Sequence, residues 1–329
     1  MNSINLILGT MTFGESVFSP EVSRFINAFL DAGYAELDTA YVYNEGSSEK
    51  LIGEVIKEID KPYKISTKVN PRVFGKLDSD AAYKQIRTSL LRLCVDCVDT
   101  FYLHFPDPAT PVNSVLEACE NLYSQGKIRE LGLSNFPAWM VADIWHICDK
   151  NGWIKPTVYE GIYNPLTRKA ETELKDCLGY FGLRFNAYNP MAGGLLTGRY
   201  GKVEDVPTVG RFTHRPNYQN RYWKKSYFEA VEIIKEAASN HGITSIEATY
   251  RWLAYHSMLN VEQGDGIILG ASKVEHLIQN MEAVKAGPLP EDILKSFEQA
   301  WEITKQDSPE YFTLYKGGGS VGGKRGSGG

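Results

Sequence analysis

The amino-acid sequence predicts an α/β fold, a (β/α)8 TIM barrel whose site lies at the C-terminal ends of the strands. Eight short runs rich in apolar and β-forming residues follow one another, and helix-length segments separate most of them. Strands that alternate with helices imply right-handed βαβ units and a parallel sheet. The GxGxxG turn of an open dinucleotide-binding sheet is absent after the first run, and AGGLLTG (192–198) has a different glycine spacing. These observations favour the closed barrel.

The predicted strands, in chain order, cover residues 4–11, 35–40, 63–69, 98–104, 128–134, 156–164, 183–190 and 266–272. Residues 19–34 and 80–93 are two of the intervening segments. Their apolar residues recur every three or four positions, as they do on one face of a helix. Eight such repeats over about 280 residues fit a closed barrel.

Local signals indicate where some helices begin and end. Residues 47–59 open with two serines followed by Glu49, which predicts a helix start. Asn135 is the expected cap of the helix after the fifth strand, with Pro137 early in that helix and Gly152 past its end.

The segment between Gly193 and Arg221 follows the seventh predicted strand and is unusually long. Long loops in compact domains commonly act as lids or binding loops. A loop that leaves a barrel strand lies on the catalytic face, so this segment is expected near the site.

Composition sets limits on the class of protein. The 329 residues are 43% hydrophobic and 23% charged, with a net charge of −5 and a pI near 5.8, so no general nucleic-acid footprint is expected. The chain begins without a basic and apolar leader, and it contains no apolar run long enough to span a membrane. We therefore expect a cytoplasmic protein that binds neither nucleic acid nor membrane. Residues 1–315 are expected to form one domain, and residues 316–329 a flexible Gly/Ser-rich tail.

Cysteine usage gives little indication of chemistry. Cys94 and Cys97 form a single CxxC pair, without a second pair or a nearby pair of histidines, so zinc binding is weakly supported. The structural interpretation, small apolar residues around a helix end, is favoured. No metal is expected.

Unusual polar residues gather at the predicted C-terminal strand ends. They are Asp38, Lys68, His104, Ser134, Asn135, Glu160, Tyr188 and Asn189, with Tyr43 on the loop after the second strand. Taken singly, a lysine at a strand end is usually a surface residue, a histidine after an apolar strand usually belongs to the core, and a tyrosine usually packs. Asp38 and Lys68 explain each other as a buried ion pair, however, because a buried charge needs a partner.

Such a pair suggests proton donation. An ammonium beside Tyr43 is expected to lower the pKa of the phenol and improve it as an acid. His104 is suited to hydrogen-bond a substrate oxygen. The group contains no obvious nucleophile or metal cage, so it suits protonation of an oxygen while hydride reaches the attached carbon, which requires a cofactor.

At this point the residues resemble the aldo-keto reductase superfamily, most closely its aflatoxin-aldehyde and succinic-semialdehyde reductase branch. The resemblance runs from LGTMTFG at residue 8 to SPEYF near residue 312. Its specific motifs are LDTAYVYNEGSSEKLIG, STKVNP, YLHFPD, GKIRELGLSNF, YNPMAGGLLTGRY and GIILGASKVEHLIQN.

The resemblance implies a role for each matching residue. Asp38, Tyr43, Lys68 and His104 would be the catalytic tetrad, with Tyr43 as the proton donor. The cofactor would be NADPH or NADP+, held by Met11, Ser134, Asn135, Glu160, Tyr188, Asn189, Pro190, Gly193, Leu195, Arg199, Arg211, Ser272, Lys273, His276, Gln279 and Asn280. Lys273 and His276 would favour NADPH over NADH by adding positive charge at a helix start. The substrate would be a small-molecule carbonyl compound, with Tyr218 and Arg221 on its side of the site. The resemblance also implies a possible homodimer.

Two positions depart from the family pattern. Most relatives have a glutamine where this chain has Glu160, and a carboxylate donates a hydrogen bond only when it is protonated. We hypothesise that Glu160 weakens NADPH binding or shifts the redox preference of the site. Relatives often have an arginine where this chain has Thr313, so small acidic aldehydes become less favoured than neutral or bulkier carbonyl compounds.

Two alternatives to a general carbonyl reductase stay open. One is a non-catalytic NADPH-binding subunit, similar to the β subunits of potassium channels. The other is a tailoring oxidoreductase of secondary metabolism that acts on an unusual carbonyl, imine or enone.

Overall fold

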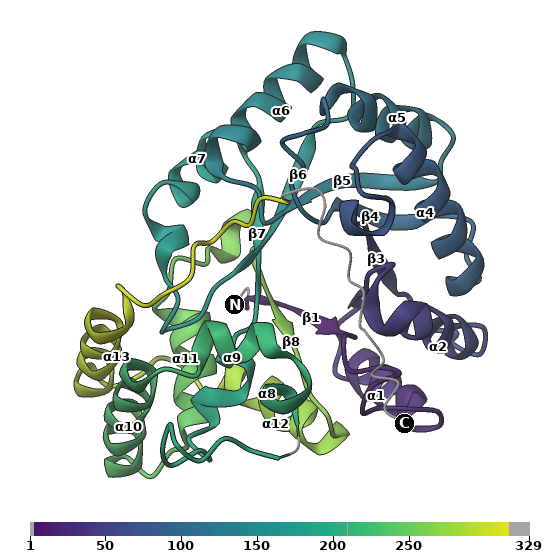
Figure 1. The fold of residues 1–329 in the computed structure, drawn as a ribbon. Coiled ribbons are helices and arrows are strands. Elements are labelled where there is room, and N and C mark those ends of the chain that lie inside the picture. Colours follow the sequence, from purple (N-terminus) through teal and green to yellow (C-terminus); the bar gives the residue numbers. More distant parts are fainter. Residues whose placement is uncertain (1–2, 209, 316–329) are drawn as a thin grey trace, which may run out of the picture.

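The computed structural model describes residues 3–208 and 210–315, and its eight parallel strands close into a barrel in chain order (Figure 1). The strands are β1 (Asn5–Gly9), β2 (Glu36–Asp38), β3 (Lys64–Val69), β4 (Val98–Leu103), β5 (Ile128–Ser134), β6 (Pro156–Ile162), β7 (Arg184–Tyr188) and β8 (Gly266–Leu269). β1 pairs with β2 on one side and with β8 on the other. The predicted (β/α)8 barrel is confirmed. The expected tail, residues 316–329, lies outside the described residues.

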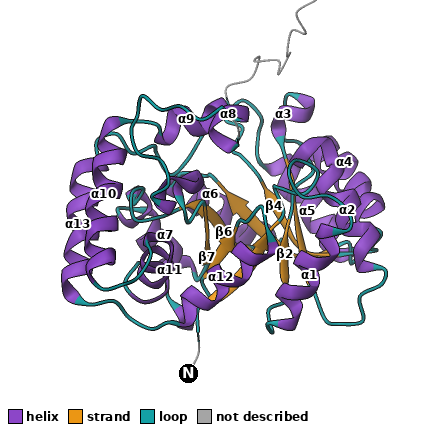
Figure 2. Ribbon diagram, turned by 90° about the horizontal axis from the view of Figure 1, so that it is seen from below, coloured by secondary structure: helices purple, strands orange, loops and turns teal. Residues whose placement is uncertain are grey.

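Helices surround the strands, as Figure 2 shows with the strands in orange and the helices in purple. The helices that follow the first six strands include α1 (Glu21–Asp31), α2 (Ser47–Ile56), α3 (Pro71–Phe74), α4 (Ser79–Leu93), α5 (Asn113–Ser124), α6 (Ala138–Asn151) and α7 (Leu174–Phe181). The later ones are α8 (Arg211–His214), α9 (Pro216–Tyr222), α10 (Lys225–Asn240), α11 (Ser245–Tyr255), α12 (Val274–Lys285) and α13 (Glu291–Thr304). Short 3₁₀ segments are η1 (Tyr43–Gly46), η2 (Lys169–Glu171), η3 (Ala192–Thr197) and η4 (Val261–Gln263).

The strands are buried on both faces, as expected for a parallel sheet covered by helices. All four residues of β8 are buried, and the apolar stripe of α1, which includes Phe25 and Phe29, packs into the same core. The observed strands are up to three residues shorter than predicted, and β5 has the predicted bounds. β1, for example, ends at Gly9 because the chain then turns, with the Phe13 N–H donating to the Thr10 carbonyl (2.9 Å).

Two predicted helix starts differ in detail. Asn135 does not cap α6: its backbone is left-handed (φ 63°), and the cap position belongs to Pro137. The α2 helix begins at Ser47 as expected, but the residue before it is Gly46 with φ 88°, without a side-chain cap. Asn135 Nδ2 contacts the His104 carbonyl instead, and Ser48 Oγ contacts Thr10 and Thr39.

The long segment after β7 contains η3, α8 and α9 and lies on the same face as the strand ends (Figures 1 and 2). Cys94 directly follows α4, in a left-handed conformation (φ 55°), which agrees with the structural interpretation of the CxxC pair. Within residues 3–208 and 210–315, no three His, Cys, Asp or Glu side chains are grouped to hold a metal ion. No helix in the described part of the chain has the length and apolarity to cross a bilayer.

Candidate active site

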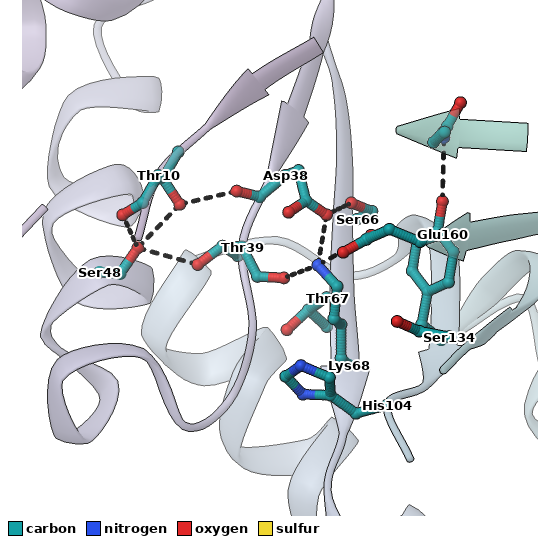
Figure 3. A network of polar contacts seen from close by, with 12 residues as sticks. Thr10, Asp38, Thr39, Ser48, Ser66, Thr67, Lys68, His104, Ser134 and Glu160 are labelled. Atoms are coloured by element: carbon teal, nitrogen blue, oxygen red, sulfur yellow. Dashed lines mark hydrogen bonds and ion pairs between the residues drawn. The ribbon is translucent and has the colours of Figure 1, made fainter. Parts of the chain in front are cut away.

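The expected ion pair between Asp38 and Lys68 is present at the C-terminal end of the barrel, which we call the mouth (Figure 3). Asp38 ends β2, and Lys68 lies in the neighbouring β3. The Lys68 side chain is 0% exposed, and its ammonium donates to Asp38 Oδ1 and to the Thr39 carbonyl (2.8 Å). Burial alone would lower the pKa of Lys68, but Asp38 and Glu160 together raise it well above its ordinary value. Lys68 is therefore a permanent buried cation.

A hydroxyl network fixes the backbone at Asp38. Thr10 Oγ1 donates to the Asp38 carbonyl (2.8 Å), and Ser48 Oγ lies 2.8 Å from Thr10 Oγ1 and 2.9 Å from Thr39 Oγ1. Figure 3 shows this chain of contacts on the side away from Lys68. Ser66 Oγ donates to Asp38 Oδ1 (2.7 Å), so the carboxylate accepts from two donors. Asp38 is held in place on both sides.

Tyr43 lies in η1, with its ring centroid 5.5 Å from Lys68 Nζ and 6.1 Å from the His104 ring centroid. The expectation that its pKa is lowered is wrong for this structure. Burial raises the pKa of Tyr43 by more than Lys68 lowers it, and the charges of Asp38 and Glu160 raise it further. Tyr43 is a neutral phenol, with its proton in place.

His104 follows β4 and is 8% exposed. Burial lowers its pKa well below the ordinary value, and the charges of Lys68 and Arg72 lower it further, so the ring is neutral. Asn70 fixes the tautomer. Its Oδ1 accepts from the Arg72 N–H (2.9 Å), which turns its Nδ2 donor toward His104 Nδ1 at 3.2 Å. The proton of the neutral ring is therefore on Nε2.

Glu160 on β6 is 3% exposed, and its Oε2 lies 3.2 Å from Lys68 Nζ. Lys68 thus has two carboxylate neighbours, one from β2 and one from β6. Burial raises the pKa of Glu160 to about 8, and Asp38 contributes to the rise while Lys68 opposes it. Sequence reasoning placed Glu160 beside a cofactor amide but did not anticipate its contact with Lys68.

The predicted amide-binding residues also meet at the mouth. Ser134 ends β5, and Asn135 Nδ2 lies within hydrogen-bond distance of the His104 carbonyl (2.9 Å) and of Ser134 Oγ (2.9 Å). Tyr188, at the end of β7, donates to Asn135 Oδ1 (2.6 Å). Asn135, which is 4% exposed, therefore connects three strand ends.

The long segment reaches back over the ends of the first and seventh strands. Tyr218 on α9 donates to Asn189 Oδ1 (3.0 Å), and its hydroxyl lies 4.0 Å from Met11 Sδ. Gly193 packs beneath its ring, where a Cβ would lie 2.7 Å from Tyr218 Cδ1. The structure thus brings together Met11, Asn189, Gly193 and Tyr218. Pro190 and Leu195, from the same predicted loop, are buried in the wall.

The predicted arginines occupy different positions. Arg211 lies 5.2 Å from the Tyr218 ring centroid, and Arg221 lies 5.8 Å from both the Tyr218 and Tyr222 ring centroids. Arg199 is exposed and donates to the adjacent Tyr200 hydroxyl. Arg211 and Arg221 are therefore packed against the aromatic wall of the segment, whereas Arg199 faces solvent.

The predicted phosphate segment surrounds the N-terminus of α12. Ser272, Lys273, His276 and Gln279 are exposed, while Asn280 is buried. Lys273 is the residue before the helix and has no side-chain cap bond. Because the first N–H groups of a helix have no partners within it, this end is suited to an anion. These residues form a group of their own, separate from the Lys68 contacts.

Three residues that matter to the site geometry were not predicted. Asn70 fixes His104, Tyr102 has its ring centroid 5.3 Å from Lys68 Nζ, and Asn186 Nδ2 lies 3.2 Å from the Tyr102 hydroxyl. For Tyr102 and Asn186 the available signal was a polar side chain on a strand, since Tyr102 pairs in register with Lys68 and Asn186 with Glu160. Asn70 directly follows β3 and caps α3.

Comparison with known proteins agrees with the barrel. The sequence model described as the aldo/keto reductase family matches residues 5–302. Human aflatoxin B1 aldehyde reductase member 2 is 46% identical over 321 residues, which cover 93% of this chain and 89% of the relative. Human aldo-keto reductase family 7 member A3 is also 46% identical, covering 93% and 96%. An aldo-keto reductase of Pseudocercospora fijiensis is 38% identical, covering 85% and 97%. With matches of this extent and identity, the chain belongs to the aldo/keto reductase family and is an oxidoreductase.

Proposed function

We propose that this protein uses NADPH to reduce an aldehyde or ketone to an alcohol, with Tyr43 as the proton donor. The observation that carries the proposal is the fully buried Lys68 ammonium beside the Tyr43 ring, held by Asp38 at the barrel mouth. A permanent cation next to a phenol stabilises the oxyanion that proton donation leaves behind. Reduction of a carbonyl compound with a tyrosine as the acid leaves this negative charge on the tyrosine oxygen.

Tyr43 gives its proton to the carbonyl oxygen as the carbonyl carbon is reduced. Because the pKa of Tyr43 is raised in the protein alone, the phenol holds its proton until a substrate oxygen accepts it. Lys68 then faces a tyrosinate, and Asp38 keeps Lys68 oriented. Solvent restores the proton to Tyr43 before the next turnover.

His104 orients the substrate. The Asn70 contact leaves the ring proton on Nε2, and the low pKa of His104 keeps the ring a neutral donor. A neutral donor directs the carbonyl oxygen without competing with Tyr43 as an acid. The ring centroids of Tyr43 and His104 lie 6.1 Å apart, which would let both donors serve one carbonyl oxygen.

The bound cofactor, when reduced, supplies the hydride. Ser134, Asn135 and Glu160 would hold its carboxamide, Tyr188 would pack on its ring, and residues 189–199 with Arg211 would cover its diphosphate. The fit is supported by the uncapped N-terminus of α12, a twelve-residue helix with Lys273 before it and His276 in its first turn. This end would take the adenosine 2′-phosphate, which favours NADPH over NADH.

The proposed substrate is a neutral aldehyde or ketone. The Thr313 N–H donates to the Asn135 carbonyl (3.1 Å), which places an uncharged residue next to the mouth. Tyr218 and Arg221 border the proposed substrate side from α9. The human relative named for reduction of an aflatoxin aldehyde supports an aldehyde of some size. A homodimer and a cytoplasmic location stay predictions.

The test measures loss of reduced-nicotinamide absorbance with an aromatic aldehyde, a 1,2-diketone and succinic semialdehyde. Tyr43→Phe is the matched variant, because it removes one hydroxyl. We expect turnover by the wild type, a loss of about 10² to 10⁴ in kcat for Tyr43→Phe, and retained NADPH binding. Binding without turnover of any carbonyl compound would refute the proposal and favour the non-catalytic or specialised alternatives.

A further inference from the structure

Lys68 is shared by two buried carboxylates, and the second one has no role in the proton donation described above. Asp38 and Glu160 are 3% exposed each, and both approach the same ammonium. Figure 3 shows Glu160 entering from the β6 side, opposite the Thr39 and Ser48 contacts. With both carboxylates ionised, the closed cluster would carry one net negative charge, which is unfavourable in a buried site.

The two carboxylates differ in the hydrogen bonds that they accept. Asp38 Oδ1 accepts from Ser66 and from Lys68. Glu160 Oε2 is within ion-pair distance of Lys68 (3.2 Å), yet it accepts no well-aligned hydrogen bond from the described residues. When the cluster takes up a proton, Glu160 therefore receives it. The other titratable groups around it are Lys68, Asp38, Tyr43, Tyr102 and Tyr188.

A cavity at the opposite end of the barrel extends inward as far as Asp38, although neither Lys68 nor Glu160 lines it. This cavity, of about 190 Å³, is lined by Asp38, Ser66, Tyr102 and Asn186 at its inner end. The rest is lined by charged residues near the beginnings of the strands and by aliphatic side chains: Glu36, Lys64, Asp99, Arg129, Glu130 and Arg184, with Ile7, Leu37, Ile65 and Ile268. Asn186 Oδ1 is buried and lacks a hydrogen-bond partner among the described residues. A cavity of this size with several polar groups in its lining accommodates water, which would offer protons a path to Asp38 that bypasses the mouth.

We propose that Glu160 is a positioning residue that exchanges one proton with solvent in the folded protein and, through Lys68, sets how readily Tyr43 gives up its proton. The inference rests on the proposed function of Tyr43. With Glu160 neutral, the Lys68 charge is available to the Tyr43 oxyanion. With Glu160 ionised, that charge is shared and a second negative charge lies nearby, so the tyrosinate is disfavoured. Glu160 itself neither gains nor loses a proton over one reduction.

The first test measures thermal unfolding of the protein without cofactor between pH 5 and pH 9. The pKa of Glu160 is raised in the folded state, so the folded protein binds more protons than the unfolded chain and loses stability as the pH rises toward and through about 8. Glu160→Gln removes this loss. We therefore expect the Tm of the variant, relative to the wild type, to rise from pH 5 to about pH 8 and to level off toward pH 9.

Glu130→Gln is the matched control, since it makes the same chemical change at the other end of the barrel. Burial alone would raise the pKa of Glu130, but its bonds and ion pair with Arg184 lower it. Its ionised form is therefore present across this range, and the Tm loss of the variant should not depend on pH. A Tm difference for Glu160→Gln that is equally flat would overturn the inference.

The second test compares kcat against pH for the wild type and Glu160→Gln. Wild-type kcat should fall about tenfold per pH unit above the titration of Glu160, until Tyr43 transfers its proton by the slower route. In Glu160→Gln the fall should be absent or begin at least one unit higher. If the wild type turns over and the two profiles coincide, the inference fails and the proposed function stands. If the wild type reduces no carbonyl compound at any pH, both fail.

Discussion

Removing the carboxylates of Asp38 and Glu160 separately and together should show that Glu160 is a reserve partner of Lys68, which replaces Asp38 in the ion pair when Asp38 is lost. In Asp38→Asn, Glu160 loses the negative neighbour that helps hold its proton, so it ionises and pairs with Lys68. An ammonium and a carboxylate 3.2 Å apart attract each other by about 5 kcal/mol at an effective dielectric constant of about 20, before desolvation is subtracted. We expect each single variant to lose about 1–2 kcal/mol of unfolding free energy or less.

In the double variant, Lys68 is left 0% exposed without any carboxylate partner. An isolated buried charge of this kind costs about 3–5 kcal/mol. The double variant should therefore exceed the sum of the singles by about 1–3 kcal/mol, the range measured for residues of one network.

The assay is urea denaturation at pH 7 without cofactor, followed by circular dichroism, for all four proteins of the cycle. Asp38→Asn combined with Asp292→Asn serves as the control cycle, because Asp292 pairs with His241 on the outside of the barrel and shares no partner with Asp38. That control should be additive to within about 0.5 kcal/mol. If Asp38→Asn and Glu160→Gln are equally additive, the reserve-partner reasoning is wrong.

The other predictions concern separate parts of the molecule. Lys273→Ala should weaken NADPH binding roughly fivefold and leave NADH binding unchanged, as titration of cofactor fluorescence would show; an equal loss for both cofactors would contradict the phosphate assignment. Gly193→Ala should lower the unfolding free energy by about 1–3 kcal/mol, because its φ is 72° and a Cβ would meet the Tyr218 ring at 2.7 Å. Arg92→Met should cost about 3–5 kcal/mol in urea denaturation, since it leaves the fully buried Glu49 without its ion pair; a loss below about 1 kcal/mol would contradict this.

The barrel could be predicted because strand and helix periods alternate clearly along the chain. The strand ends were less predictable, since they depend on where polar groups find partners. β1, for instance, stops at Gly9, and the chain then turns at Thr10, whose hydroxyl bonds to the Asp38 carbonyl. Asparagine is a residue type favoured at helix caps, but Asn135 instead joins three strand ends, because its left-handed backbone directs its amide to the His104 carbonyl.

The Asp38–Lys68 pair could be predicted because neighbouring parallel strands place their ends together. The direction of the pKa shift of Tyr43 could not be predicted, because it depends on whether the effect of burial or the effect of the Lys68 charge is larger. The contact between Lys68 and Glu160 could not be predicted from the sequence either. It joins β3 to β6, which are not neighbours in the sheet, so only the three-dimensional closure of the barrel brings them to 3.2 Å.

Because Lys68 is completely enclosed, the reactivity of its amine can be used to detect opening of the barrel. Acylating reagents modify amines that reach solvent, and lysines such as Lys64, Lys84 and Lys225 have side chains more than half exposed. Lys68 has no exposed surface, so it reacts only in molecules whose barrel has opened. Mass spectrometry can follow the acylation rate of Lys68 and of those exposed lysines. The ratio of the two rates would therefore report how often the barrel opens around Lys68.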